Sequence, residues 1–133
     1  MPASASEALS AIPLFSRLPV RQLRKLLRSV AEHRYEPGTT IVREGGRTAT
    51  LFIVLEGEAK VVRNGRTISR RRPGEFFGEI SMIDGRPRAA SVIAETPTRC
   101  LVLEQGSLKK LVKTEPSVAW ALLESLATRL RGE

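Results

Sequence analysis

The first strong hydrophobic pattern in the chain has the period of an amphipathic helix, with basic side chains on the opposite face. The apolar positions are Val20, Leu23, Leu26, Leu27, Val30 and Ala31, and the basic positions are Arg21, Arg24, Lys25 and Arg28. Pro19 stands where a first-turn proline is tolerated, and the turn signal Glu36-Pro37-Gly38 follows. The pattern predicts an N-terminal helix that ends near Arg34, with His33 as a solvated or capping residue at its end.

From residue 39 onward the pattern changes to short apolar runs separated by turn residues, which is typical of β-strands. The runs cover residues 40–43, 51–55, 59–62, 67–69, 90–94 and 99–103. Asn64-Gly65 lies between two of these runs and supplies the positive φ angles of a type I′ turn, so it predicts a hairpin. Strands at this regular spacing favour a β-sandwich or a β-roll.

A helical period returns after Glu104 and predicts a short helix over 107–112 and a longer one over 116–131. The apolar positions of the longer helix are Val118, Ala119, Leu122, Leu123, Leu126 and Leu130. A chain of 133 residues fits one domain. We expect a flexible lead (1–11), an N-terminal helical part (12–35), a roll (36–104) and C-terminal helices (105–133) packed back on the roll.

Composition narrows the class of protein. The chain is 41% hydrophobic and 27% charged, as in ordinary globular domains. It has no apolar run near the ~18–20 residues of a membrane span and no sign of a secretory signal, so we expect no membrane partner. The single cysteine, Cys100, cannot form an internal disulfide, and this fits a cytoplasmic location. We interpret Cys100 as a small buried hydrophobic residue.

Histidine and cysteine are too few for the common catalytic centres. Zinc and non-haem iron sites usually need at least two His or Cys ligands, and this chain has only His33 and Cys100. A Ser-His-Asp triad would depend on His33, and no G-x-S-x-G motif is present. We therefore expect no enzymatic activity, no metal site and no cofactor.

The net charge of +8 brings nucleic acid, an acidic membrane or a phosphate ligand into consideration as partners. Most charge runs are solvated surface. We interpret Arg70-Arg71-Arg72 as a solvated strand end, and the basic face of the N-terminal helix in the same way.

Residues 76–92 carry the most informative chemistry. Gly78 and Glu79 open a short apolar segment that can form one helical turn, and Arg88 follows nine residues after the glutamate. Backbone N–H groups at a helix start suit an anion, and glycine lets a ligand approach the backbone closely. An arginine fork matches two phosphate oxygens, and a glutamate can accept a hydrogen bond from a sugar hydroxyl. These residues imply a ligand with one compact phosphate and a ribose hydroxyl.

The segments Phe77-Gly78-Glu79-Ile80-Ser81 and Pro87-Arg88-Ala89-Ala90-Ser91-Val92 resemble the phosphate-binding cassette of cyclic nucleotide-binding domains. Such domains occur in regulatory subunits of protein kinase A, in cyclic nucleotide-gated channels and in bacterial catabolite activator proteins. The resemblance covers roughly residues 12–131 and includes the turns at 35–38 and 42–45. It implies a mainly β fold: an eight-stranded β-roll of the double-stranded β-helix or jelly-roll type, with one N-terminal and two C-terminal helices.

The resemblance also implies roles for individual residues. Glu79 would accept the ribose 2′-OH, and Arg88 would pair with the exocyclic oxygens of the cyclic phosphate. The remaining ligand-binding positions are Gly78, which permits the close approach, the backbone N–H groups of Ile80, Ser81 and Ala89, and the small residue Ala90 beside the arginine. The alternative is a ligand-free domain in which Glu79 and Arg88 form a buried ion pair.

The position after the cassette arginine bears on the choice of base. Domains of this family that prefer cGMP often carry Thr or Ser there, where a hydroxyl meets the guanine amino group. Ala89 has no hydroxyl, so cAMP is expected to bind better than cGMP. Trp120 is the large aromatic residue of the last predicted helix, and we expect it to cap a base or to pack near a hinge.

The leading hypothesis is a non-catalytic cyclic nucleotide sensor whose C-terminal helix moves on binding. One alternative is the sensor part of a catabolite-activator-type transcription regulator. Because no helix-turn-helix follows Glu133, no DNA binding by this chain is expected. Another alternative is a ligand-free module that dimerises, or binds an effector, through the C-terminal helix. The arginine-rich composition is associated with a bacterial source.

Overall fold

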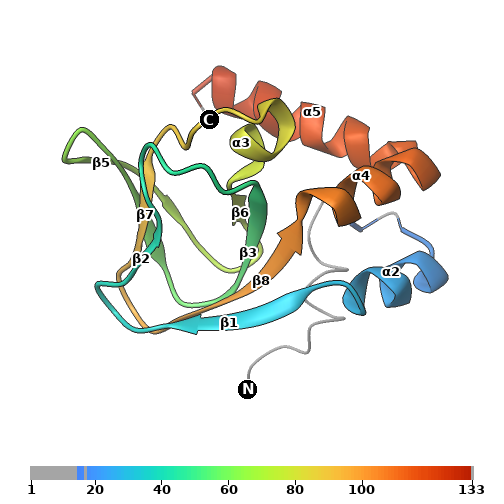
Figure 1. Ribbon diagram of the computed structural model, residues 1–133, viewed down its shortest axis with the longest axis horizontal. Coiled ribbons are helices and arrows are strands. Elements are labelled where there is room, and N and C mark those ends of the chain that lie inside the picture. Colours follow the sequence, from blue (N-terminus) through green and yellow to red (C-terminus); the bar gives the residue numbers. More distant parts are fainter. Residues whose placement is uncertain (1–14, 17, 133) are drawn as a thin grey trace.

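The computed structural model describes residues 15–16 and 18–132 and shows a β-roll with helices at one side (Figure 1). Helix α2 lies beside α4, while α5 passes close to the short helix α3. The elements are α2 (Val20–Leu27), β1 (Ala31–Tyr35), β2 (Thr40–Val42), β3 (Thr50–Glu56), β4 (Ala59–Arg63), β5 (Arg66–Arg71), β6 (Phe76–Phe77), α3 (Glu79–Asp84), β7 (Ser91–Ala94), β8 (Thr98–Glu104), α4 (Gln105–Thr114) and α5 (Pro116–Leu130).

The strands form two antiparallel sheets, ordered β1-β8-β3-β6 and β2-β7-β4-β5. Strand β3 contributes to two cores because its side chains alternate between its faces. Phe52 and Val54 join the core between the sheets, while Leu51 and Ile53 pack against the helices. Burial on both faces explains why β3 is an unbroken apolar run in the sequence. Within the described residues, the expected fold class is confirmed: eight strands with flanking helices.

The hairpin predicted at Asn64-Gly65 is confirmed. Both residues have positive φ angles, 52° and 76°, as a type I′ turn requires. Arg63 and Arg66 are directly opposite each other at the turn. The two C-terminal helices are also confirmed, although α4 is longer at both ends than predicted.

The predicted end of the N-terminal helix is wrong. Helix α2 ends at Leu27, and residues 31–35 form strand β1 along the edge of β8, with Ala31 opposite Val102 and Tyr35 opposite Thr98. The Ser29 hydroxyl donates to the Leu26 carbonyl and so satisfies an acceptor at the helix end. The apolar spacing that included Val30 and Ala31 could not reveal that β8 offers an open edge to this segment.

His33 is therefore an exposed residue of β1, opposite Cys100. It is solvated, as expected, but it lies in a strand and does not end or cap a helix, which corrects the rest of the interpretation made from the helical pattern. Cys100 is fully buried in the core between the sheets, as expected. The expected flexible lead, residues 1–11, lies outside the described residues, whereas Phe15 is buried against α2.

Helices α2, α4 and α5 share one apolar core with the outer face of the first sheet. Leu26 of α2, Leu111 of α4 and Leu122 of α5 all belong to it. A single core of this kind links the C-terminal helices to the roll. Among the described helices, none is both long enough and apolar enough to cross a membrane.

Candidate functional site

The site is built around the turn between β6 and α3. Gly78 has φ +92°, a backbone conformation that side-chain-bearing residues rarely adopt. A Cβ atom there would lie 2.5 Å from the Thr50 carbonyl oxygen and 2.8 Å from Nη1 of Arg88. Glycine is therefore required at this position for two reasons: its φ angle and the close approach of β3 and Arg88.

Arg88 is a buried cation held by the backbone of two neighbouring elements. It is 4% exposed, and its Nη1 and Nη2 groups donate to the carbonyls of Gly78 and Thr50, each at 2.9 Å. Thr48 Oγ1 accepts from Nε and from Nη2 at 3.2 Å. Burial lowers the pKa of Arg88. The sequence patterns did not single out Thr48 or Thr50, because their contacts to Arg88 cross about 40 residues of chain.

The backbone around Arg88 is clamped by a second loop. The Arg88 N–H donates to the Gly46 carbonyl and the Gly45 N–H donates to the Arg88 carbonyl, both at 2.8 Å. These bonds join the loop after β2 to the loop before β7. They fix the position from which the guanidinium reaches into the site.

Glu79 is the second buried charge of the site, with 2% exposure. Its carboxylate contacts the guanidinium of Arg129, near the end of α5. This charge contact is not a regular hydrogen bond, because Oε1 of Glu79 has no aligned donor among the described residues. No ion pair joins Glu79 to Arg88 among these residues, so the alternative of a buried Glu79–Arg88 pair is wrong.

Arg129 reaches the site from a helix that is distant in the sequence. Its Nη2 donates to the Phe76 carbonyl at 2.9 Å, and its guanidinium carbon lies 5.2 Å from the centre of the Phe76 ring. Burial, with the nearby positive charge of Arg71, lowers the pKa of Arg129 to about 10, and Glu75 opposes this shift. Arg129 therefore remains protonated at neutral pH and neutralises Glu79.

A pocket of about 160 Å³ connects these groups. All seven residues expected to bind a ligand line it: Gly78, Glu79, Ile80, Ser81, Arg88, Ala89 and Ala90. Val42, Val61 and Phe77 give it an apolar wall, and Arg63, Ser69, Arg71 and Arg129 were not expected. The side chain of Ile80 is 49% exposed. In the first turn of α3 the backbone N–H groups of Ile80 and Ser81 have no acceptor within the helix.

The three arginines at the end of β5, Arg70-Arg71-Arg72, do not share one environment, because successive side chains of a strand point to opposite faces. Arg70 pairs with Glu95 at 2.8 Å on the surface, and Arg72 lies 3.6 Å from Glu58. Arg71 turns inward, where burial lowers its pKa and its Nε donates to the Phe76 carbonyl at 3.2 Å. The interpretation as solvated surface is thus right for the outer two arginines and wrong for Arg71, and the alternation of the strand was the signal for it.

Trp120 is not part of the site. It is 63% exposed on α5 and does not line the pocket. In this structure it is therefore placed neither to cap a base nor to pack tightly. Among the described residues, no group of three or more His, Cys, Asp or Glu side chains is arranged to hold a metal ion.

Comparison with known proteins gives consistent matches. Residues 32–115 match the family model described as cyclic nucleotide-binding domain. The cAMP-dependent protein kinase regulatory subunit of Aspergillus fumigatus is 34% identical over 107 residues, which are 78% of this chain and 26% of that protein. The chain thus spans about a quarter of the length of such regulatory subunits.

Solved structures show the same fold. Thermus thermophilus catabolite activator protein superimposes with a TM-score of 0.82 at 33% identity, over 90% of this chain and 59% of that chain. A cyclic nucleotide-binding domain from Methylobacillus flagellatus also gives a TM-score of 0.82, at 30% identity, over 95% of this chain and 76% of that chain.

Proposed function

Since the chain belongs to the cyclic nucleotide-binding domain family, we propose that it senses cAMP in preference to cGMP and that binding moves helix α5. Regulatory subunits of cAMP-dependent protein kinase are among its relatives, and we propose a regulatory role without catalysis in the cytoplasm. The output of the whole protein would come from an effector protein, a further domain or a second copy of this chain, with no membrane contact and no direct DNA contact by this domain.

The unpaired positive charge of Arg88 carries the proposal. Buried charges are normally paired because burial without a partner is costly. The salt bridges of the described residues include none to Arg88, whose partners there are a hydroxyl and two carbonyls. A phosphate in the pocket would supply the missing anion. The N–H groups of Ile80, Ser81 and Ala89 would then complete its cradle.

The ribose and the base account for the rest of the pocket. Glu79 is the acceptor suited to the ribose 2′-OH, and its negative charge makes a second phosphate nearby unfavourable. Ala89 offers no hydroxyl to a guanine amino group, which supports a preference for cAMP. Val61 and Val92 give the pocket an apolar surface for the base.

Arg129 supports the coupling of the pocket to α5. Its guanidinium contacts the Glu79 carboxylate, the group that would accept the ribose hydroxyl. Arg129 also lines the pocket, whose volume is about 160 Å³. Pockets for small ligands usually measure about 300–1,000 Å³, so a nucleotide requires this one to widen. We propose that the ligand displaces Arg129 from Glu79 and thereby weakens the hold on α5. Such a ligand shifts α5 only by the difference between its affinities for the two positions.

Calorimetric titration with cAMP and cGMP tests the binding site. Arg88→Lys keeps the charge but replaces the planar fork by a point charge, and we expect at least about tenfold weaker cAMP binding. Arg86→Lys is the matched control, because it makes the same replacement two residues away on an exposed side chain. Unchanged cAMP affinity in a folded Arg88→Lys protein would contradict the proposal, as would tighter binding of cGMP than of cAMP by the wild-type protein.

Hydrogen exchange tests the coupling. With saturating cAMP we expect the amides of α5 to exchange faster, because the Arg129–Glu79 contact is lost. Strand β8 serves as the internal control, since it is buried in the first sheet and should not change. Identical exchange of α5 with and without bound cAMP would exclude release of this helix.

A further inference from the structure

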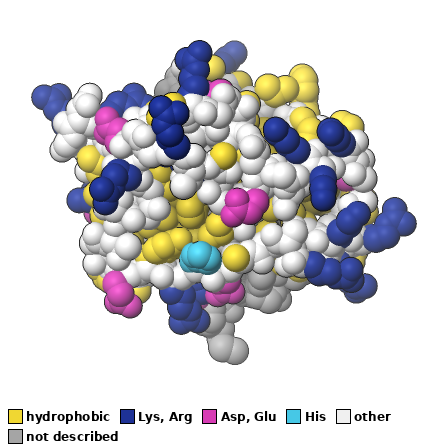
Figure 2. Space-filling model, viewed as in Figure 1, with side chains coloured by type: hydrophobic (Ala, Val, Ile, Leu, Met, Phe, Trp, Pro, Cys, Tyr) yellow, Lys and Arg dark blue, Asp and Glu magenta, His cyan; other side chains and the backbone are white. Residues whose placement is uncertain are grey.

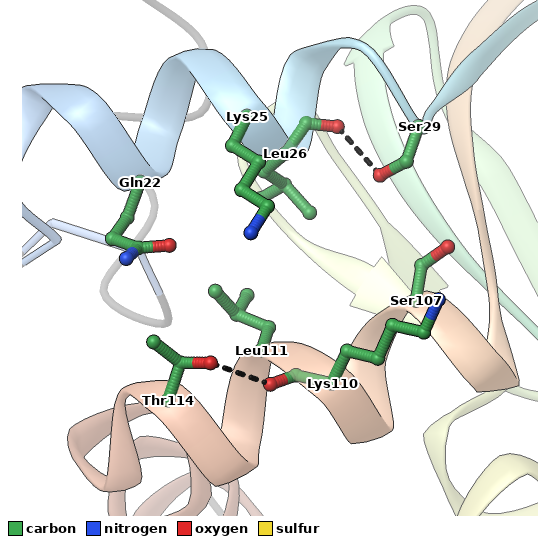
Figure 3. A pocket seen from close by; sticks show the side chains of 8 residues that line it. All are labelled: Gln22, Lys25, Leu26, Ser29, Ser107, Lys110, Leu111 and Thr114. Carbon is green, nitrogen blue, oxygen red and sulfur yellow. Dashed lines mark hydrogen bonds between the residues drawn. The ribbon is translucent and has the colours of Figure 1, made fainter.

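A second concave surface lies between α2 and α4, away from the nucleotide pocket. Figure 3 shows this groove, of about 210 Å³, with the side chains of Gln22 and Lys25 directed into it from α2. Leu26 and Leu111 form its floor and belong to the core, with 4% and 7% exposure. Its remaining lining residues are Ser29, Ser107, Lys110 and Thr114.

The two helices that form the groove carry basic residues and no acidic ones. Helix α2 has the sequence VRQLRKLL and α4 has the sequence QGSLKKLVKT. With Arg28 at the end of α2, the basic positions are Arg21, Arg24, Lys25, Arg28, Lys109, Lys110 and Lys113, all exposed. None of them belongs to a salt bridge among the described residues. In Figure 2, Lys and Arg side chains gather on the side where Figure 1 places these helices.

We propose that this groove docks an acidic peptide segment of a partner protein, with an apolar residue between carboxylates. The apolar residue would cover Leu26 and Leu111, and the carboxylates would reach Lys25 and Lys110 on the two walls. The Gln22 amide offers both a donor and an acceptor to peptide backbone. The positive charge of the two helices has no salt-bridge partner within the described part of the chain and is complementary to such a segment. This site does not depend on nucleotide binding.

Neither a membrane nor a nucleic acid fits the groove as well. A helix that binds a bilayer surface exposes large apolar side chains. Among the described residues of α2 and α4, Val20 is the single exposed large hydrophobic residue. Among the described residues, the groove lining contains neither an aromatic residue, on which a base could stack, nor an arginine, which would bind phosphate bidentately.

Fluorescence anisotropy with a labelled Glu-Leu-Glu-Glu-Leu-Glu peptide tests the proposal. We expect saturable binding that weakens in about 0.5 M salt, as screening of exposed charges requires. Two control peptides should bind more weakly: Gln-Leu-Gln-Gln-Leu-Gln, which lacks the carboxylates, and Glu-Ser-Glu-Glu-Ser-Glu, which lacks the apolar side chains. Binding of the glutamine peptide as tight as that of the acidic one would overturn the proposal.

Charge reversal locates the site. Lys25→Glu with Lys110→Glu should weaken peptide binding about tenfold or more. Arg34→Glu with Arg66→Glu makes the same change in net charge on exposed positions of β1 and β5, and it should have little effect. If both double variants lose the same amount of affinity for the acidic peptide, the peptide is attracted by net charge alone, and the proposal is overturned.

Two further measurements exclude the other outcomes. Far-UV circular dichroism and thermal unfolding establish that the variants fold, and Lys25→Gln with Lys110→Gln replaces the charge reversal if that variant does not. Phosphatidylcholine–phosphatidylserine vesicles and a short mixed-sequence DNA duplex are titrated in parallel. Tighter binding of either one than of the peptide, lost on charge reversal at Lys25 and Lys110, would assign the groove to that class of partner instead.

Discussion

Alanine at Gly78 should destabilise the fold more than alanine at Gly85 and should also displace Arg88. Both glycines have left-handed backbone, with φ +92° and +71°, so alanine costs about 1–2 kcal/mol at each from the backbone alone. The surroundings differ. A Cβ at Gly78 would lie 2.5 Å from the Thr50 carbonyl oxygen, whereas no heavy atom lies within 4 Å of a Cβ at Gly85.

The difference in unfolding free energy between Gly78→Ala and Gly85→Ala measures how closely the site is packed around Gly78. Overpacking typically adds about 1–3 kcal/mol, so the total for Gly78→Ala is about 2–5 kcal/mol, against about 1–2 kcal/mol for Gly85→Ala. Because the Cβ would also lie 2.8 Å from Nη1 of Arg88, the guanidinium must shift and lose its alignment with a phosphate. We therefore expect Gly78→Ala to weaken cAMP binding and Gly85→Ala to retain it.

Urea unfolding followed by far-UV circular dichroism gives the two free energies, and equal m-values establish that they are comparable. Calorimetry with cAMP gives the affinities. If Gly78→Ala and Gly85→Ala lower the free energy of unfolding by amounts that agree within about 0.5 kcal/mol, the packing argument is refuted. Wild-type affinity in Gly78→Ala would refute the link between this glycine and Arg88.

Two further predictions concern buried groups. A double-mutant cycle with Glu79→Gln and Arg129→Gln should give a coupling free energy of unfolding of about 1–3 kcal/mol, and additive effects in urea unfolding would show that the two residues do not interact. Burial raises the pKa of the Cys100 thiol to about 12. Iodoacetamide at about pH 8 should therefore label Cys100 slowly in the native protein and rapidly in urea, and mass spectrometry would reveal fast native labelling as a contradiction.

Local chemistry made the hairpin and the helix starts predictable. The Asn64-Gly65 pair sets its own φ angles, and Pro116 at the first position of α5 suits a helix start regardless of what packs on it. The cassette residues were also predictable as a group, because all seven fall in two short segments, 78–81 and 88–90, that are close in the sequence. All seven line one pocket.

The end of the N-terminal helix was not predictable in this way. Residues 31–35 follow the helical period closely enough to extend it, yet they form a strand because β8 presents unpaired backbone groups there. Hydrogen bonds to a distant edge outweigh a weak local preference for helix. The same limit applies to β6, whose two residues pair with Phe52 and Ile53 of β3.

The sequence by itself determined the roll, its turns and the cassette residues that line the pocket, because periodicity, turn chemistry and the cassette act over a few residues. Only the tertiary structure decided which charges meet. It paired Glu79 with Arg129, fifty residues away, and turned Arg71 inward. It surrounded Arg88 with two carbonyls and a hydroxyl, and no salt bridge to Arg88 occurs among the described residues. These contacts depend on how α5 and β5 pack against the site, and side-chain spacing along the chain carries no record of distances across the fold.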